Sequence, residues 1–144
     1  MAAIEPAGEP EPGGGEPNKV RRKVKRTLAL PKGLVDPGEK ALDTALREVC
    51  EETGISADPV TKLGDIKYIY TRTWAGGERV FKIVSFYLMR YRSGRIDDVV
   101  PVMRIEVARA SWVPLQEAPR LLAYKGEKQM AQRALDYVEA HGDL

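Results

Sequence analysis

Apolar residues recur at helical spacing in one central stretch of the chain, and helix-terminating residues mark both of its ends. The apolar face consists of Ala41, Leu42, Ala45, Leu46 and Val49. Before it, Asp36-Pro37-Gly38-Glu39 offers an N-cap, a proline at the first helical position and a capping-box glutamate. Gly54 offers a C-cap. The pattern therefore predicts one helix from Pro37 to Thr53.

Two later runs are rich in β-branched and aromatic residues, which is typical of strands. They cover Lys67–Trp74 and Val80–Tyr91, and Ala75–Glu78 between them favours an antiparallel hairpin. Phe86 and Tyr87 must face opposite sides of their strand, so one of them is expected in the core. The other expected elements are a short strand at Ala2–Glu5, a strand at about Ala108–Val113, a short helix at Leu115–Leu122 and a longer helix at Glu127–Ala140.

The N-terminal region changes composition twice. Residues 6–18 are rich in Pro, Gly and Glu and are predicted to form a flexible loop, and Lys19–Arg26 is strongly basic. The basic run is suited either to phosphate or to a solvated strand edge. Core-forming residues begin near Val20 and at 27–30. With 144 residues, the whole chain is expected to form a single domain, residues 1–144.

Several classes of protein are disfavoured by what the chain contains. The single cysteine, Cys50, cannot form an internal disulfide, and the single histidine, His141, excludes a His-rich zinc site and a Ser-His-Asp arrangement. No apolar run reaches the ~20 residues that span a bilayer, and the first residues do not resemble a secretory signal. A net charge of +2 gives no argument for nucleic acid. We expect a cytoplasmic protein without a membrane partner.

Three glutamates carry the candidate chemistry. Glu48, Glu51 and Glu52 are spaced i, i+3 and i+4, so they project from adjacent positions on the helix. Arg47 can neutralise only one of them, whereas a divalent cation can neutralise the cluster. Ligation by oxygen alone favours Mg²⁺ or Mn²⁺. An ordinary solvated acidic patch remains the alternative reading of these three residues.

The spacing of residues around these three glutamates supports a metal site. Gly33, Glu39 and the run from Arg47 to Ile55 occupy every position of the Nudix box, and the chain resembles the Nudix hydrolase family. The resemblance implies an α/β fold in which a mixed sheet is sandwiched between helices (α/β/α). It also implies that Glu48, Glu51 and Glu52, with the carbonyl of Gly33, bind the metal, that Arg47 orients the glutamates and that Glu39 is structural. Such a site acidifies a water for in-line attack on phosphorus.

Features outside the box resemble the diadenosine tetraphosphate hydrolase branch. They are Lys32 in Pro31-Lys32-Gly33, Lys82 in the second hairpin strand, and Tyr124, which we expect to stack on a purine. Glu106 resembles a glutamate that acts as a general base or extra ligand, although an exposed loop acid would look the same. Trp112 is expected to pack in the core.

The expected reaction is cleavage of a phosphoanhydride bond in a nucleotide substrate, most simply diadenosine tetraphosphate to ATP and AMP. The alternatives are a diphosphoinositol polyphosphate substrate, a nucleoside triphosphate substrate, or a regulatory Nudix domain without activity. The sequence allows a monomer or a homodimer. The chain departs from the family pattern before the box, where the first strand is short and few apolar residues surround Val20. The sequence therefore leaves open whether the first sheet is complete.

Overall fold

The computed structural model describes residues 1–7, 27–72 and 76–142. The expected loop from residue 8 onward, the basic run Lys19–Arg26 and Trp74 lie outside the described residues. Within them, β1 (Ala2–Pro6) pairs antiparallel with β4 (Val107–Trp112), and β2 (Ile55–Arg72) pairs antiparallel with β3 (Glu78–Gly94). The helices are α1 (Ala41–Thr53), the 3-10 helix η2 (Pro101–Ile105), α2 (Ala118–Leu121) and α3 (Lys125–His141).

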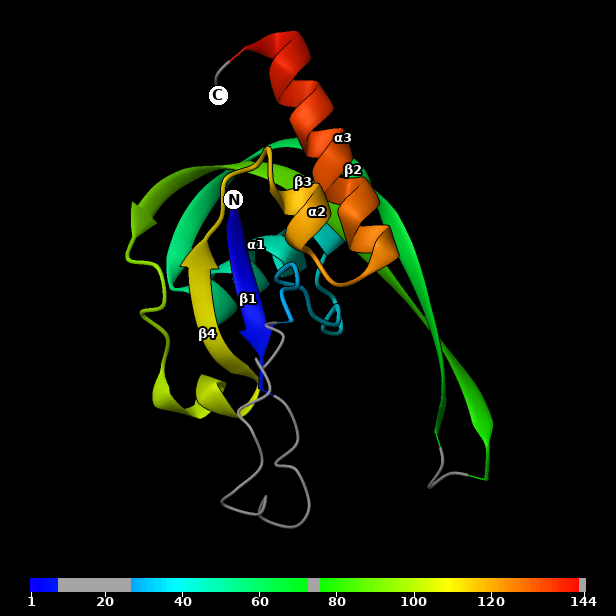
Figure 1. Cartoon of the computed structure of the whole chain (residues 1–144). Coiled ribbons are helices and arrows are strands. Elements are labelled where there is room, and N and C mark those ends of the chain that lie inside the picture. The colour runs from blue at the N-terminus through cyan, green and yellow to red at the C-terminus, as the bar shows by residue number, and fades with distance from the viewer. Residues whose placement is uncertain (8–26, 73–75, 143–144) are drawn as a thin grey trace, which may run out of the picture.

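The two strand pairs have different surroundings (Figure 1). The β1–β4 pair lies in front of α1, whereas the β2–β3 hairpin runs beside α3 and extends beyond the rest of the molecule. In the described part of the chain these two pairs are separate sheets. The parallel component of the expected mixed sheet is an isolated bridge between Leu28 and Leu122. None of the helices described is long and apolar enough to cross a membrane.

The hairpin is confirmed, but β2 starts at Ile55, twelve positions before the expected Lys67. Pro59 and Gly64 lie in this early part, and both residue types normally weaken a strand. Register shifts next to Pro59 and Gly64 accommodate them, because a bulge lets a strand continue past a residue that fits the ladder poorly. Local composition therefore did not reveal the first two thirds of this strand.

The helix α1 begins later than the sequence predicts. Its N-cap is Lys40 rather than Asp36. The segment Asp36–Glu39 forms a turn in which the Glu39 amide donates to the Asp36 carbonyl at 2.9 Å and the Asp36 amide donates to Glu39 Oε1 at 3.2 Å. The expected side-chain partner of the capping box is thus present, but it closes a turn before the helix. At the other end, Gly54 is the C-cap with φ 84°, as predicted.

The core lies in three small clusters rather than one dense layer. Phe86 is buried with Val84 against Met130 of α3, which confirms that one of the Phe86–Tyr87 pair is in the core. Trp112 was expected in the core, and this is wrong: its side chain is 48 % exposed and meets Tyr91 edge-on at 5.7 Å between ring centroids. Trp112 is the last residue of β4, and Tyr91 of β3 covers only part of its side chain.

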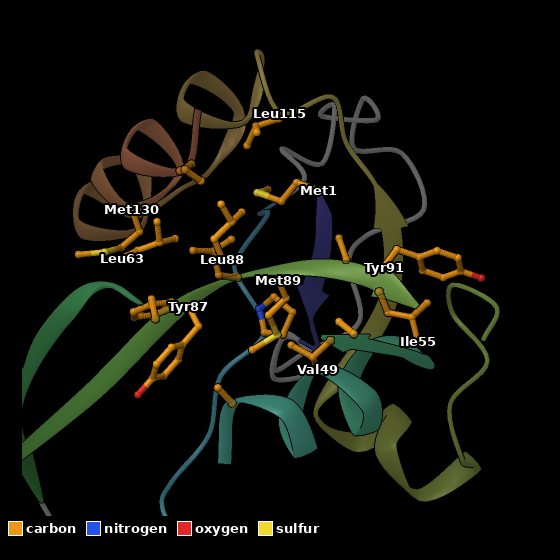
Figure 2. Close-up of a pocket in the computed structure, with 18 of the residues that line it drawn as sticks. Met1, Val49, Ile55, Leu63, Tyr87, Leu88, Met89, Tyr91, Leu115 and Met130 are labelled. Atoms are coloured by element: carbon orange, nitrogen blue, oxygen red, sulfur yellow. The ribbon is translucent and has the colours of Figure 1, made fainter. Parts of the chain in front are cut away.

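An apolar cavity of about 280 Å³ lies between α1, the β2–β3 hairpin and α3. Figure 2 shows its lining side chains, which come from α1, both hairpin strands and α3, with Met1 and Leu115 at the far side. The apolar face of α1 contributes Ala45 and Val49. The cavity therefore lies on the apolar side of the helix, and the catalytic candidates occupy different positions of the same helix.

Candidate active site

Two of the three candidate ligands are buried although they are acidic. Glu48 is 9 % exposed and Glu52 is 6 % exposed, whereas Glu51 lies on the exposed side of α1. The charge of Glu48 adds to the effect of burial in raising the pKa of Glu52, so the two carboxylates interact electrostatically. Buried acids are costly unless they are paired, so this arrangement is one that a cation would stabilise.

Arg47 connects the helix to the turn that precedes it. Its guanidinium contacts Glu39 at 2.9 Å, Glu48 at 3.0 Å and Glu51 at 3.1 Å, and it donates to the Leu34 carbonyl at 3.2 Å. The fork geometry of arginine makes several simultaneous contacts possible. The salt bridges implied for Arg47 are therefore present, and the hydrogen bond from Arg47, followed by that from Thr44, lowers the pKa of Glu39 to about 2.

The loop before the helix brings Gly33 against Glu48. A Cβ at position 33 would lie only 2.0 Å from Glu48 Oε1, so no other residue fits there without moving the carboxylate. The adjacent Lys32 amide donates to Glu52 Oε2 at 3.2 Å. The residues on either side of this peptide bond thus each contact one of the buried carboxylates.

The electrostatics of the pair follow from burial. Burial raises the pKa of Glu52 to about 8, with the Glu48 charge adding to the shift and the Lys32 amide opposing it. Burial also raises the pKa of Glu48, aided by the Glu51 charge and opposed by Arg47. Strongly raised carboxyl pKa values at a cluster of acids are typical of functional sites.

The donor set fits a hard divalent cation. Carboxylate oxygens of Glu48 and Glu52, with a main-chain carbonyl at Gly33, are the ligand types that Mg²⁺ and Mn²⁺ prefer. Glu51 is turned to Arg47 instead, and within residues 1–7, 27–72 and 76–142 no three acidic, histidine or cysteine side chains are gathered as a finished metal cage. Glu51 would therefore exchange its contact with Arg47 for the cation.

Two of the expected substrate-binding residues meet. The Lys32 ammonium lies 5.9 Å from the centroid of the Tyr124 ring, and Tyr124 is the N-cap of α3 with 48 % of its surface exposed. The same ammonium pairs with Glu127 at 3.2 Å. Lys82 lies opposite Tyr68 in the β2–β3 pairing, on the strand face that also carries Val84 and Phe86.

Glu106 is farther along the chain, at the end of η2. Its side chain is exposed, and its main chain contacts Met103 and Ala7. The proposed part of Glu106 as a base or additional ligand stays a prediction.

Sequence reasoning missed two residues that organise the site, Glu127 and Tyr68. Glu127 is completely buried, and Tyr68 donates to it at 3.3 Å. An acid in the first turn of a helix is common for reasons of the helix dipole alone, so nothing in the local sequence distinguishes Glu127. The aromatic run around Tyr68 predicted a strand but no particular contact.

Comparison with known proteins identifies the family of this chain. The NUDIX domain family model matches residues 18–134. The chain belongs to the Nudix family. It is 40 % identical over 121 residues to the putative mutator protein MutT4 of Mycobacterium tuberculosis, an alignment that covers 84 % of this chain and 46 % of MutT4. It therefore spans about half the length of that relative.

A second relative is the asymmetrical bis(5'-nucleosyl)-tetraphosphatase of Mus musculus, 30 % identical over 114 residues, which cover 75 % of this chain and 69 % of the mouse protein. Among solved structures, a NUDIX hydrolase from Nitrosomonas europaea superposes with a TM-score of 0.60 over 94 % of this chain and 80 % of that one, at 20 % identity. That likeness confirms the expected α/β Nudix fold.

Proposed function

We propose that this protein is a divalent-metal-dependent pyrophosphohydrolase that cleaves a phosphoanhydride bond in a nucleoside-diphosphate-linked substrate. The observation that carries the proposal is the burial of both Glu48 and Glu52, Glu48 against Gly33 and Glu52 against the Lys32 amide. The acids of a solvated surface patch would not be buried in this way. The complete Nudix box around it supports the same conclusion.

The residues divide into two groups in this proposal. Glu48, Glu51, Glu52 and the Gly33 carbonyl would hold Mg²⁺ or Mn²⁺, and the ion would neutralise phosphate oxygens and make the attacking water more acidic. Arg47 fixes the carboxylates through its contacts with Glu39, Glu48 and Glu51. The water oxygen forms a bond to phosphorus and gives its proton to a carboxylate, with Glu106 as the proposed base, while the anhydride P–O bond breaks and the released phosphate oxygen leaves as an anion.

The preferred substrate in this proposal is diadenosine tetraphosphate, which takes up one water and gives ATP and AMP. The half-exposed Tyr124 beside the Lys32 ammonium supports a site for an aromatic base next to phosphate. The similarity to the mouse tetraphosphatase over 69 % of its length also supports it. Lys82 and Glu106 complete the proposed site as a phosphate ligand and a general base or extra ligand.

A substrate panel with Mg²⁺ tests this proposal. It compares diadenosine polyphosphates, nucleoside triphosphates, nucleotide sugars and a diphosphoinositol polyphosphate, with products identified by chromatography. We expect ATP plus AMP from diadenosine tetraphosphate, and loss of activity in the presence of EDTA. A preference for nucleotide sugars would contradict the choice of substrate and leave the metal chemistry intact.

Glu52→Gln tests the assignment of the helix. Removing the charge of one ligand is expected to lower kcat by about 100-fold or more. The metal would lose an anionic ligand, and the negative charge that develops in the transition state would be stabilised less well. The matched control is Glu139→Gln, which changes an exposed glutamate on α3 and should leave kcat unchanged. If Glu52→Gln hydrolysed its substrate as fast as the parent protein, the carboxylate cluster would not be the catalytic site.

A further inference from the structure

The fully buried carboxylate of Glu127 lies at the start of α3, outside the Nudix box. A charge with no exposure is stable only with close partners. Glu127 has three: the Leu30 amide at 2.5 Å, the Lys32 ammonium at 3.2 Å and the Tyr68 hydroxyl at 3.3 Å. Leu30 and Lys32 belong to the segment that leads into the box, and Tyr68 belongs to β2. One side chain therefore joins three distant parts of the chain.

Lys32 is the partner through which Glu127 can affect the site. Its ammonium donates to the Leu30 carbonyl at 3.1 Å and pairs with Glu127. These two contacts use two of the three N–H groups of Lys32. The Lys32 side chain retains 22 % exposure, so the third N–H group can serve a ligand. Without a fixed anion behind it, a flexible lysine side chain would adopt many positions.

The other contacts place this ammonium among the substrate-side groups. It lies 5.9 Å from the ring of the half-exposed Tyr124. Tyr68 donates to Glu127 Oε2, the same oxygen that pairs with Lys32, and lies opposite Lys82 in the hairpin. Burial, together with the charge and hydrogen bond of Glu127, raises the pKa of Tyr68, so its hydroxyl remains a donor to the carboxylate.

We propose that Glu127 is a positioning residue for substrate binding, which holds the Lys32 ammonium beside Tyr124 so that one N–H group is presented to a phosphate of the substrate. This proposal rests on the proposed function. Glu127 acts through Lys32 and does not touch the reacting atoms. Its loss therefore affects binding of the substrate much more than the rate of the chemical step.

The test is a double-mutant cycle of Glu127→Gln and Lys32→Met in the full chain. Glu127→Gln retains the shape and an acceptor for the Leu30 amide but removes the charge. We expect KM for the substrate to rise about tenfold while kcat changes by less than about threefold. In the Lys32→Met background the same Glu127→Gln change should alter KM by less than about twofold, because the residue through which it acts is absent. Glu139→Gln on the same helix is the control and should change neither constant.

Thermal unfolding of the four proteins provides a second measurement. Lys32→Met alone leaves Glu127 buried without its cation and should lower the Tm, and adding Glu127→Gln should recover part of that loss. If Glu127→Gln lowers the Tm but leaves KM unchanged, its role is structural only and the proposal is wrong. The proposal is also wrong if the change in KM of the double variant equals the product of the changes in the two single variants.

Binding of a methylene-bridged, non-hydrolysable analogue of diadenosine tetraphosphate, measured by calorimetry with Mg²⁺, separates this proposal from the proposed function. If the parent protein binds the analogue but hydrolyses no compound of the panel, only the proposed function fails, and the cycle is evaluated from dissociation constants. If the parent protein binds and Glu127→Gln binds equally well, only the role of Glu127 fails. If the parent protein neither binds nor hydrolyses, both fail.

Discussion

At the scale of single residues, the site depends on burying acids that water would otherwise stabilise. Glu48 tolerates burial because Arg47 contacts it, and Glu52 tolerates it because the Lys32 amide contacts it and its raised pKa favours the neutral form. Glu127 tolerates it because a lysine, a tyrosine and a main-chain amide surround it. Under the proposed function a cation would complete the first pair, whereas Glu127 already has its partners within the protein.

This difference predicts how stability depends on pH. Glu52 has a pKa of about 8 in the folded protein and an ordinary value of 4.5 when unfolded. Between these values the unfolded chain has released its proton while the folded protein retains it, so the free energy of unfolding falls as pH rises. We expect the EDTA-treated protein to lose a few kcal/mol of stability from pH 5 to pH 8, measured by urea unfolding.

Glu52→Gln carries no titratable group at this position, so its free energy of unfolding should fall much less between about pH 5 and pH 8. Mg²⁺ should also reduce this decline, since a cation favours the charged carboxylates. A decline of the same size in Glu52→Gln would show that another group causes it.

At the scale of elements, the C-terminus of α1 is fixed by Gly54. Its φ of 84° is left-handed, and a Cβ there would lie 2.6 Å from the carbonyl oxygens of both Arg95 and Asp98. The helix end is therefore packed directly against the loop that follows β3, and Asp97 donates its amide to the Thr53 carbonyl at 2.7 Å. This contact holds the C-terminal end of α1 against the loop.

Gly54→Ala should accordingly destabilise the protein by about 2–4 kcal/mol, because backbone strain and a clash with main-chain atoms add together. Gly38→Ala is the matched control: Gly38 has φ 79°, but a Cβ there would meet nothing within 4 Å. Its cost should be about 1 kcal/mol, from the left-handed conformation alone. Equal losses for the two variants in chemical unfolding would contradict the packing of Gly54 against the loop.

At the scale of the whole molecule, the apolar cavity of about 280 Å³, which is partly open to solvent, lies between α1, the hairpin and α3. Ala134 of α3 is buried and lines this cavity together with the hairpin and α1, so it offers a position from which the space can be filled.

Ala134→Leu is expected to stabilise the protein by about 1 kcal/mol and to raise the Tm by about 3 °C, because the added carbons fill existing space. Ala140→Leu, on the exposed part of the same helix, controls for helix propensity and should change the Tm by less than 1 °C. A lower Tm for Ala134→Leu in calorimetry would show that the side chain has no room there.

The amino-acid sequence by itself determined the features that depend on neighbours along the chain. The spacing of Glu48, Glu51 and Glu52, the contact of Arg47 with Glu51 one turn away and the glycine at the end of α1 follow from the geometry of a helix, which is the same in any protein. The order of strands and helices was predictable for the same reason.

The tertiary structure alone decided which acids are buried and what pairs with them. Glu127 meets Leu30 across 97 positions and Tyr68 across 59, and no local pattern encodes such contacts. The same holds for the late start of α1, where Arg47 draws Glu39 into a turn, and for the early start of β2, which β3 supports despite Pro59 and Gly64. The free energies of these contacts depend on burial and on pairing between distant residues, and both exist only once distant segments have come together.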